Sequence, residues 1–378
     1  MDQIPLQKGA LRLMPGLLLK NAKLIDGSQV DIAIADGKIT AIGTALPETA
    51  AETVDLSEAG FLTPGWIDSH VHCFEAMDLY TDFPDEIGVK KGVTTVVDAG
   101  SAGCSNIGEF YQMAKNASTN TLAFLNISRN GIVAQNELED LSNIDVMAAK
   151  EAVEKFSDFI VGFKARMSKT VVGPNGIKPL LLAKEIQEGT GLPIMVHIGS
   201  EPPVLFEILD VMDAGDILTH CFNGKPNGIL GNSAIKPEAH LAKEKGIVFD
   251  IGHGTDSFNF NVAKTAFSEN LKADLISTDI YIRNRLNGPV YDLPTTMEKL
   301  MAIGYSLEEV IEKVTSAPAK ALGLASKGRL EVGADADFTI FKVESGTKTL
   351  TDSNGFTQTV ETLVIPQKAI VGGTIYEC

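Results

Sequence analysis

The sequence predicts an α/β protein: a (β/α)8 TIM barrel with a small β-sandwich domain formed from both chain ends. Two observations lead to this prediction. Along the middle of the 378-residue chain, eight short apolar runs alternate with helix-like stretches. That alternation over about 260 residues is typical of eight strand–helix units that close into a barrel. Both ends instead contain only short strand-like segments and turns.

The two chain ends are expected to fold together. The N-terminal segments are Leu17–Leu19, Asp31–Ala35, a turn at Asp36–Lys38, and Ile39–Ile42; the C-terminal ones are Phe338–Val343, a polar stretch at 345–357, Ala369–Val371, a Gly372–Gly373 turn and Thr374–Tyr376. Neither end is long enough for a core of its own. We therefore expect residues 1–61 and 328–378 to form the β domain around a barrel at 62–327. Met14 is an alternative start, which would make residues 1–13 an extension.

The middle of the chain supplies the barrel elements. The expected strands are Trp66–Val71, Val93–Val97, Leu122–Ile127, Phe159–Phe163, Ile194–Val196, Ile217–Thr219, Ile247–Phe249 and Leu275–Thr278. The expected helices are Ile107–Ala117, Val146–Phe156, Pro179–Glu188, Val204–Met212 and Pro237–Lys245, and another begins at Ser306, which forms a capping box with Glu309. The pattern alone leaves an open doubly wound sheet as the alternative.

Charge and composition restrict the partners. The chain has 32 basic and 49 acidic residues, a net charge of −17. Phosphate backbones and anionic membrane surfaces should repel it, and no run of Lys and Arg offsets this. We expect a small-molecule substrate, no nucleic acid and no membrane, and a homo-oligomer. The four cysteines form no C-x-x-C pair, which indicates reduced thiols in a cytoplasmic protein.

Polar side chains gather where the predicted strands end. Barrel enzymes place their active sites at the carboxyl ends of the strands. In chain order these positions hold His70, His72, Asp98, Asn126, Lys164, His197, His220, Asp250 and Asp279. The whole chain contains six histidines, so four of them lie at strand ends.

The spacing of these residues favours a metal site. His70 and His72 are two residues apart, so both point to one face of a strand. His197 and His220 are separated by about one strand–helix unit, which places them on adjacent strands, and Asp279 follows about two units later. Imidazoles completed by a carboxylate suit zinc. A lone H-x-H pair would be at least as consistent with a structural role.

Lys164 requires a separate argument. An ammonium group has no lone pair and would repel a nearby dication. In a low-dielectric site a lysine loses its proton readily, and the free amine can take up carbon dioxide as an anionic carbamate. The residues alone leave open the alternative of a lysine paired with an acidic neighbour.

Several motifs resemble one enzyme superfamily. Phe61–His72 is similar to the first barrel strand of the amidohydrolase superfamily, and Gly333–Phe338 resembles the return to its β domain. Further matching segments are Val161–Ser168, Val196–Ser200, Leu218–Gly224, Phe249–Asp256 and Ser277–Tyr281. The resemblance spans about residues 16 to 376 and is greatest to a bacterial amidohydrolase/deacetylase subgroup, whose members are often labelled dihydroorotase or adenine deaminase.

The resemblance implies a binuclear zinc centre, with two Zn²⁺ per subunit. By analogy, His70, His72 and Asp279 hold one ion and His197 and His220 the other, while carboxylated Lys164 bridges both. It further implies a hydrolase that cleaves an amide or ester bond, deacetylase-like, through a metal-bridging hydroxide whose proton Asp279 accepts and passes on.

Two departures bear on the activity. Dihydroorotases of this superfamily usually carry an arginine two residues after the second histidine, where this chain has Phe74. Related adenine deaminases do not use a bridging lysine, in contrast to Lys164. A deaminase or cyclic-amide hydrolase with the same centre remains the alternative. A non-catalytic barrel is a third hypothesis, which the retained ligand set argues against.

The sequence indicates the residues that determine substrate specificity less clearly than it indicates the metal ligands. Arg166, Arg283 and Arg285 could each clamp a substrate carboxylate, and each could equally form a structural salt bridge. His253 could donate to the substrate or be an ordinary loop residue. Of these, we predict Arg166, Arg283 and His253 as substrate-binding residues for a small, carboxylate-bearing molecule.

Overall fold

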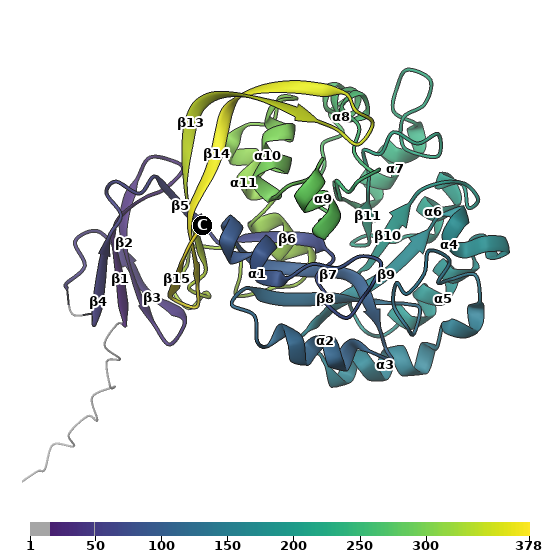
Figure 1. Ribbon diagram of the computed structural model, residues 1–378, viewed down its shortest axis with the longest axis horizontal. Helices are drawn as coiled ribbons and strands as arrows, with labels where there is room; N and C mark the ends of the chain where they lie inside the picture. Colours follow the sequence, from purple (N-terminus) through teal and green to yellow (C-terminus); the bar gives the residue numbers. More distant parts are fainter. Residues whose placement is uncertain (1–15, 49) are drawn as a thin grey trace, which may run out of the picture.

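The computed structural model describes residues 16–48 and 50–378, so the extension expected at residues 1–13 lies outside the described residues. Two sheets organise the chain (Figure 1). One sheet, at the left of the view, combines strands from both chain ends. The other is parallel and curled, with helices on its outer side.

The first sheet has eight strands. Along the sheet the order is β15 (Thr374–Glu377), β14 (Thr357–Val371), β13 (Phe338–Thr351), β5 (Phe61–Pro64), β1 (Leu17–Lys23), β2 (Gln29–Ala35) and β3 (Lys38–Gly43), and β4 (Glu52–Asp55) pairs with β1. The two ends join where Phe338 pairs with Pro64. They share a buried core that includes Leu19, Ile32 and Ile370. The predicted sandwich arrangement and domain boundaries stay predictions.

The second sheet has seven parallel strands in chain order. They are β6 (Trp66–Val71), β7 (Val93–Gly103), β8 (Asn120–Asn126), β9 (Ile160–Met167), β10 (Ile194–Ile198), β11 (Ile217–Thr219) and β12 (Val248–Phe249). Each coincides with one of the first seven expected runs. Burial on both faces explains why these strands are continuous apolar runs and do not alternate.

The eighth expected run, Leu275–Thr278, is not a regular strand. Isolated parallel bridges join Leu275 to Asp250 and Ile280 to Val71. Asp68 accepts hydrogen bonds from the backbone N–H and the hydroxyl of Thr278, at 3.1 and 2.6 Å, so a side chain replaces part of the usual ladder. The segment nevertheless lies between β12 and β6, which makes the domain barrel-like.

The described part of the chain contains twelve α-helices, most of which lie on the outer side of the curled sheet (Figure 1). They are α1 (Pro84–Ile87), α2 (Ile107–Ala114), α3 (Val146–Lys155), α4 (Lys169–Val172), α5 (Lys178–Gln187), α6 (Leu205–Val211), α7 (Pro237–Lys245), α8 (Phe260–Ser268), α9 (Ile282–Asn287), α10 (Leu293–Met301), α11 (Leu307–Glu312) and α12 (Ser316–Ala321), with short 3₁₀ turns at Val89–Lys91, Leu141–Asn143 and Gly173–Asn175. The five helices expected by range are all present. The capping box at α11 is confirmed, because Ser306 accepts from the Glu309 N–H and Glu309 accepts from the Ser306 N–H.

A long antiparallel ribbon extends from the first sheet over the barrel. β13 and β14 pair as far as Thr351 and Thr357, so most of the polar stretch 345–357 is strand, which its composition did not predict. The ribbon arches over α10 in Figure 1, and Leu350, Val360 and Val364 belong to the same buried core as the barrel helices. Packing against α10 thus outweighs the low strand propensity of the outward-facing polar residues.

Among the described residues, none of the helices combines the length and apolar character needed to cross a membrane.

Thr278→Val tests the closure of the barrel. The substitution keeps the shape of the side chain but removes the hydroxyl that donates to the buried Asp68 carboxyl. We expect a loss of about 1–3 kcal/mol in the free energy of unfolding, because a buried acceptor is left unpaired. Denaturant unfolding measures it. Thr53→Val, at an exposed position on β4, is the matched control and should change stability by less than about 0.5 kcal/mol. Equal effects of the two variants would contradict the role given to Thr278.

Candidate metal centre

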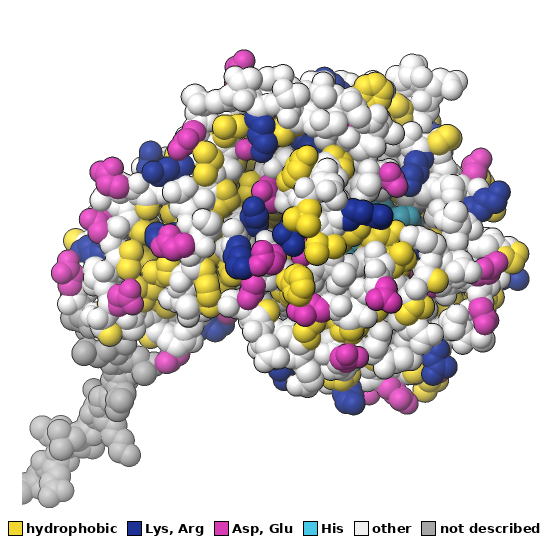
Figure 2. Space-filling view, viewed as in Figure 1, with side chains coloured by type: hydrophobic (Ala, Val, Ile, Leu, Met, Phe, Trp, Pro, Cys, Tyr) yellow, Lys and Arg dark blue, Asp and Glu magenta, His cyan; other side chains and the backbone are white. Residues whose placement is uncertain are grey.

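A cavity of about 410 Å³ opens at the carboxyl ends of the barrel strands. Its lining includes all of the predicted metal ligands, namely His70, His72, Lys164, His197, His220 and Asp279. They come from five places in the barrel. His70 and His72 flank the end of β6, Lys164 lies within β9, His197 lies near the end of β10, His220 directly follows β11, and Asp279 lies in the segment after β12. Figure 2 shows histidine atoms within the surface beside a cationic side chain. The curled sheet therefore brings together residues that are up to 209 positions apart in the chain, the separation of His70 from Asp279.

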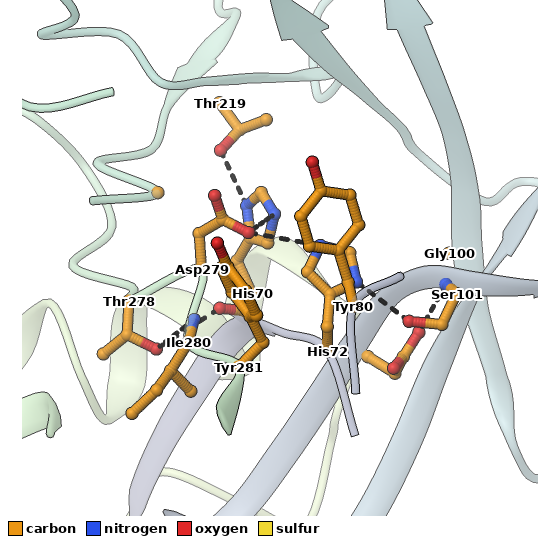
Figure 3. Close-up of polar contacts among 12 residues, drawn as sticks. His70, His72, Tyr80, Gly100, Ser101, Thr219, Thr278, Asp279, Ile280 and Tyr281 are labelled. Carbon is orange, nitrogen blue, oxygen red and sulfur yellow. Dashed lines mark hydrogen bonds and ion pairs between the residues drawn. The ribbon is translucent and has the colours of Figure 1, made fainter. Parts of the chain in front are cut away.

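Asp279 lies between the two histidines of β6. Its Oδ1 is 3.4 Å from His70 Nε2 and 3.1 Å from His72 Nε2, as Figure 3 shows. Ligand atoms of His70, His220 and Asp279 all lie within 4.8 Å of one another. Nitrogen and carboxylate oxygen atoms at this spacing can share one metal ion.

Hydrogen bonds on the outer side of two rings fix their tautomers. The Thr219 hydroxyl donates to Asp250 at 2.7 Å, so it can only accept from His70 Nδ1, 2.8 Å away. His220 Nδ1 donates to the Gly252 carbonyl at 2.6 Å. Nδ1 of both rings therefore carries a proton, which leaves Nε2 as the atom that can bind a metal in the cavity when the ring is neutral.

The other two histidines are held by their neighbours. His72 Nδ1 is 2.8 Å from the Ser101 hydroxyl, and Asp98 accepts from the Ser101 backbone N–H at 2.7 Å. The His197 ring packs edge-on against His220, with 4.5 Å between the ring centroids. Asp98 and Asp250, both singled out as strand-end residues, thus orient the ligands from behind.

Lys164 is buried without a counter-ion. Its Nζ lies 3.1 Å from His70 Nε2 and 3.4 Å from the Met195 sulfur. Within residues 16–48 and 50–378, no carboxylate oxygen comes within the 4.0 Å of an ion pair with this Nζ. Burial lowers the pKa of Lys164 to about 7. The alternative of a lysine paired with an acidic neighbour therefore has no support in the described structure.

Backbone strain is concentrated at this site. His220 and Asp279 adopt left-handed φ angles of 63° and 50°, which non-glycine residues rarely occupy. Gly252 and Gly254 also have left-handed φ angles, and a Cβ at Gly254 would lie 2.4 Å from Asp279 Oδ2. The surrounding structure must hold these conformations in place, as is common where geometry serves function.

The charges of the site suit a cation. Burial holds the pKa values of His197 and His220 well below the ordinary histidine range, so both rings are neutral at pH 7. Burial acts to raise the pKa of Asp279, but His70 and His72 beside it hold that pKa well below its usual value. The neutral imidazoles of His197 and His220 and the ionised carboxylate of Asp279 belong to a donor set that fits a divalent metal such as zinc.

Comparison with known proteins identifies the family. The family model described as "Deacetylase-like composite domain" matches residues 330–377. A protein of Enterococcus faecalis described as "Deacetylase" is 58% identical over 364 residues, which cover 96% of this chain and 99% of that protein. This chain belongs to the deacetylase family of the amidohydrolase superfamily. It is a hydrolase.

Solved structures of the superfamily agree on the fold and differ in their descriptions. One described as an adenine deaminase is 57% identical with a TM-score of 0.95, covering 96% of this chain and 100% of its own. Another, described as a dihydroorotase, is 38% identical with a TM-score of 0.88 and covers 96% and 98%. High identity to structures with different descriptions fixes the family but not the substrate.

The two arginines predicted to bind substrate have different surroundings in the structure. Arg166 and Arg283 line the cavity. Arg166 is buried, and its Nη1 donates to both oxygens of Glu137 at 3.0 and 3.1 Å. Arg283 is exposed at the mouth, where it donates to the Tyr281 hydroxyl at 3.2 Å.

Two further candidates are turned away from the cavity. Both nitrogens of His253 are occupied, Nδ1 by the Gly254 carbonyl and Nε2 by the Lys299 ammonium. His253 is fully buried and does not line the cavity, which conflicts with a substrate contact. Arg285 forms a bidentate pair with Asp82, the structural salt bridge considered for it from the sequence.

Several lining residues were not predicted from the sequence. They include Tyr80, Gln135, Lys225, Thr255 and Ser257. All lie in loops after strands, where no periodicity or ligand spacing singles out a position. Tyr281 also lines the cavity and lies at the end of the matched segment Ser277–Tyr281, a signal that could have identified it.

Gly254→Ala tests whether this glycine shapes the metal site. The new Cβ would meet Asp279 Oδ2 and displace it, so we expect zinc affinity to fall by about tenfold or more. Isothermal titration with zinc measures this. Gly176→Ala is the matched control, because Gly176 has nearly the same φ, +57° against +55°, but open space around it. Both variants should lose about 1–2 kcal/mol of stability from backbone strain. Unchanged zinc affinity in Gly254→Ala would contradict the contact.

Proposed function

We propose that this protein is a zinc-dependent hydrolase that removes an acyl group, as amide or ester, from a small carboxylate-bearing molecule. The observation that carries the proposal is the gathering of four histidines, Lys164 and Asp279 around one end of a cavity that has a cationic mouth. The deacetylase description of the 58% identical relative supports the acyl-transfer class.

The residues would divide between two ions. His70, His72 and Asp279 would hold one zinc, His197 and His220 the other, and Lys164 as a carbamate would contact both. When bound, zinc lowers the pKa of a water toward about 7 and polarises the substrate carbonyl.

The carbamate rests on the surroundings of Lys164. The neutral amine nitrogen forms a bond to the carbon of carbon dioxide and loses one proton, which leaves an anion with two oxygens. Burial lowers the pKa of Lys164 to about 7, which makes the neutral amine available. No carboxylate in the described chain competes for this Nζ as an ion-pair partner. The same lysine as an ammonium would stand 3.1 Å from a ligand nitrogen of His70, which disfavours a metal there.

Asp279 is the candidate proton carrier. It is ionised, because the neighbouring histidines hold its pKa well below the usual range. Its carboxylate borders the cavity, with 19% of the side chain exposed. It can therefore accept the proton of the attacking water and return it to the leaving nitrogen or oxygen.

Arg283 is the better placed of the two arginines for a substrate carboxylate. The guanidinium of Arg166 already donates to Glu137 and to Gln135, so its hydrogen-bond donors are largely occupied. Arg283 forms no ion pair with a carboxylate among the described residues, and it lines the same cavity as Lys225. A carboxylate at the mouth would therefore meet an unpaired cation in a chain whose net charge is −17.

A deaminase or cyclic-amide hydrolase is the second candidate, because similar structures are described as adenine deaminase and dihydroorotase. Against the second of these, Phe74 replaces the usual arginine. Its ring is buried and stacks on Phe110, with centroids 4.8 Å apart, so position 74 does not face the cavity.

The wider architecture follows the same analogy. We propose that the barrel-like domain is a (β/α)8 barrel with residues 275–280 as its eighth strand, and that the sheet from both chain ends folds as a small sandwich. We also propose a homo-oligomer that acts on a small molecule.

Chelation and product analysis test the proposed function. Dialysis against 1,10-phenanthroline should abolish hydrolysis of N-acyl amino acids and O-acyl hydroxy acids, and added zinc should restore it. Acetate release, measured by an enzyme-coupled assay, would support the deacylase. Ammonia release from ring amines without acetate release would instead favour the deaminase. A chain that binds no zinc and turns over no member of the panel would overturn both.

Asp279→Asn tests the proton carrier. The amide keeps the shape but cannot accept a proton, so kcat should fall about 100- to 10,000-fold. The four histidines remain, so much of the zinc should stay bound, as measured by atomic absorption. Asp210→Asn, at an exposed position on α6, should behave as wild type. Near wild-type kcat in Asp279→Asn would exclude this role.

A further inference from the structure

We propose that the tip of the β13–β14 ribbon, residues 352–356, is a positioning element for the metal centre. It holds the loop 252–257, and through that loop it orients His220 and Asp279. The inference deepens the proposed function and rests on it for the role of those two ligands.

The ribbon reaches the barrel from the other sheet. At its base Phe338 pairs with Pro64 of β5, and at its far end Thr351 pairs with Thr357. Figure 1 shows it arching over α10 and ending near α8. On the way, Glu298 of α10 accepts from the Val364 backbone N–H at 3.0 Å. The ribbon is thus packed along its length and presents its tip at a defined place.

Ser353 makes the contacts that reach the loop itself. Its hydroxyl donates to the Gly254 carbonyl, 3.1 Å away, with the His253 carbonyl at 3.4 Å. The same oxygen accepts from the Phe258 N–H at 3.2 Å, and the Ser353 N–H donates to the Phe258 carbonyl at 3.0 Å. One serine therefore bridges both ends of the segment 254–258.

Asp352 and Asn354 hold the tip against the start of α8. Asp352 is buried and accepts from the Phe260 N–H at 2.9 Å, while its other oxygen accepts from the Asn354 and Phe356 N–H groups and closes the hairpin. The Asn259 amide donates to Asn354 at 2.8 Å. Ordering the residues of a short polar hairpin costs conformational entropy, and these hydrogen bonds offset that cost. The tip is therefore docked on the barrel and is not a free loop.

The opposite side of the loop touches the metal centre. The Gly252 carbonyl accepts the Nδ1 proton of His220 at 2.6 Å and so sets the tautomer of that ring. Gly254 lies against Asp279 closely enough that no Cβ fits between them. Thr255 bonds to the Tyr281 hydroxyl at 3.1 Å, and Thr255 and Ser257 line the cavity.

The loop is therefore a thin layer between the ribbon tip and the ligands. Its two glycines have left-handed φ angles and no side chains of their own to pack. Without the tip, the carbonyls of residues 253 and 254 would lose their hydrogen bonds to Ser353 and would be hydrated by water. The loop would then be held only on its side toward the metal ligands. Because His220 and Asp279 are themselves in strained left-handed conformations, they depend on this support.

The test compares two serine substitutions on the same ribbon. Ser353→Ala removes the hydroxyl that reaches the loop, and Ser345→Ala, at an exposed position on β13, is the matched control. The backbone N–H groups of His253 and Gly254 are bonded to Ser277 and Thr278, so their hydrogen exchange reports opening of the loop. The second readout is the rate of zinc release to a chromophoric chelator from the zinc-loaded protein.

We expect Ser353→Ala to exchange the loop amides at least about fivefold faster, because one to two partly buried hydrogen bonds are lost. Zinc should leave about fivefold faster or more, with kcat reduced in parallel. Ser345→Ala should match wild type, and Ser353→Thr, which restores a hydroxyl, should recover most of both rates. Unchanged loop exchange in Ser353→Ala would overturn the proposal, and so would faster exchange with unchanged zinc release and kcat.

The two proposals fail in different ways. If the wild-type protein neither binds zinc nor hydrolyses the acyl panel, the proposed function is wrong. If the wild type does both and Ser353→Ala is indistinguishable from Ser345→Ala, only the positioning role is wrong.

Discussion

One backbone hydrogen bond determines much of this structure: the Asp279 N–H donates to the His70 carbonyl at 2.7 Å. It joins the first strand of the curled sheet to the segment that follows the last, and a candidate metal ligand lies on each side of the join. The adjacent Asp68–Thr278 bonds secure the same place from behind. Because the joint consists of candidate metal ligands and their immediate neighbours, the contacts that close the barrel also bring these candidate ligands together.

The histidine spacing in the sequence anticipated this arrangement because strand geometry transmits it directly. Two side chains that are two residues apart on a strand lie on the same face of the sheet. Two residues that are one strand–helix unit apart lie on adjacent strands. Both rules hold for His70, His72, His197 and His220 without any knowledge of loops. The environment of Lys164 was harder to predict. That its ammonium group has no carboxylate partner in the described structure follows from the assembled core and not from the local sequence around Lys164.

Three features could not be read from the chain. The irregular eighth segment depends on the Asp68 side chain taking backbone partners, which no strand pattern encodes. The ribbon 345–357 is polar, and it forms strands because its base is paired in the other sheet and one face packs on α10. His253 lies within the loop 252–257, whose residues Thr255 and Ser257 line the cavity, yet its ring points toward Lys299. That orientation depends on α10, which is 46 residues further along the chain.

The two arginines that line the cavity differ in burial, and this decides which of them has a guanidinium free to bind an anion. A buried guanidinium costs too much unless paired, and Arg166 is paired with Glu137 through two hydrogen bonds. Burial raises the pKa of Glu137 to about 7 even beside that partner, so Glu137 offsets the Arg166 charge fully only above neutral pH. Arg283 at the mouth keeps its charge in contact with water, where an incoming carboxylate can displace that water. The exposed arginine is therefore the one whose guanidinium stays available for the proposed substrate carboxylate, because the guanidinium of Arg166 is already bonded to Glu137 and Gln135.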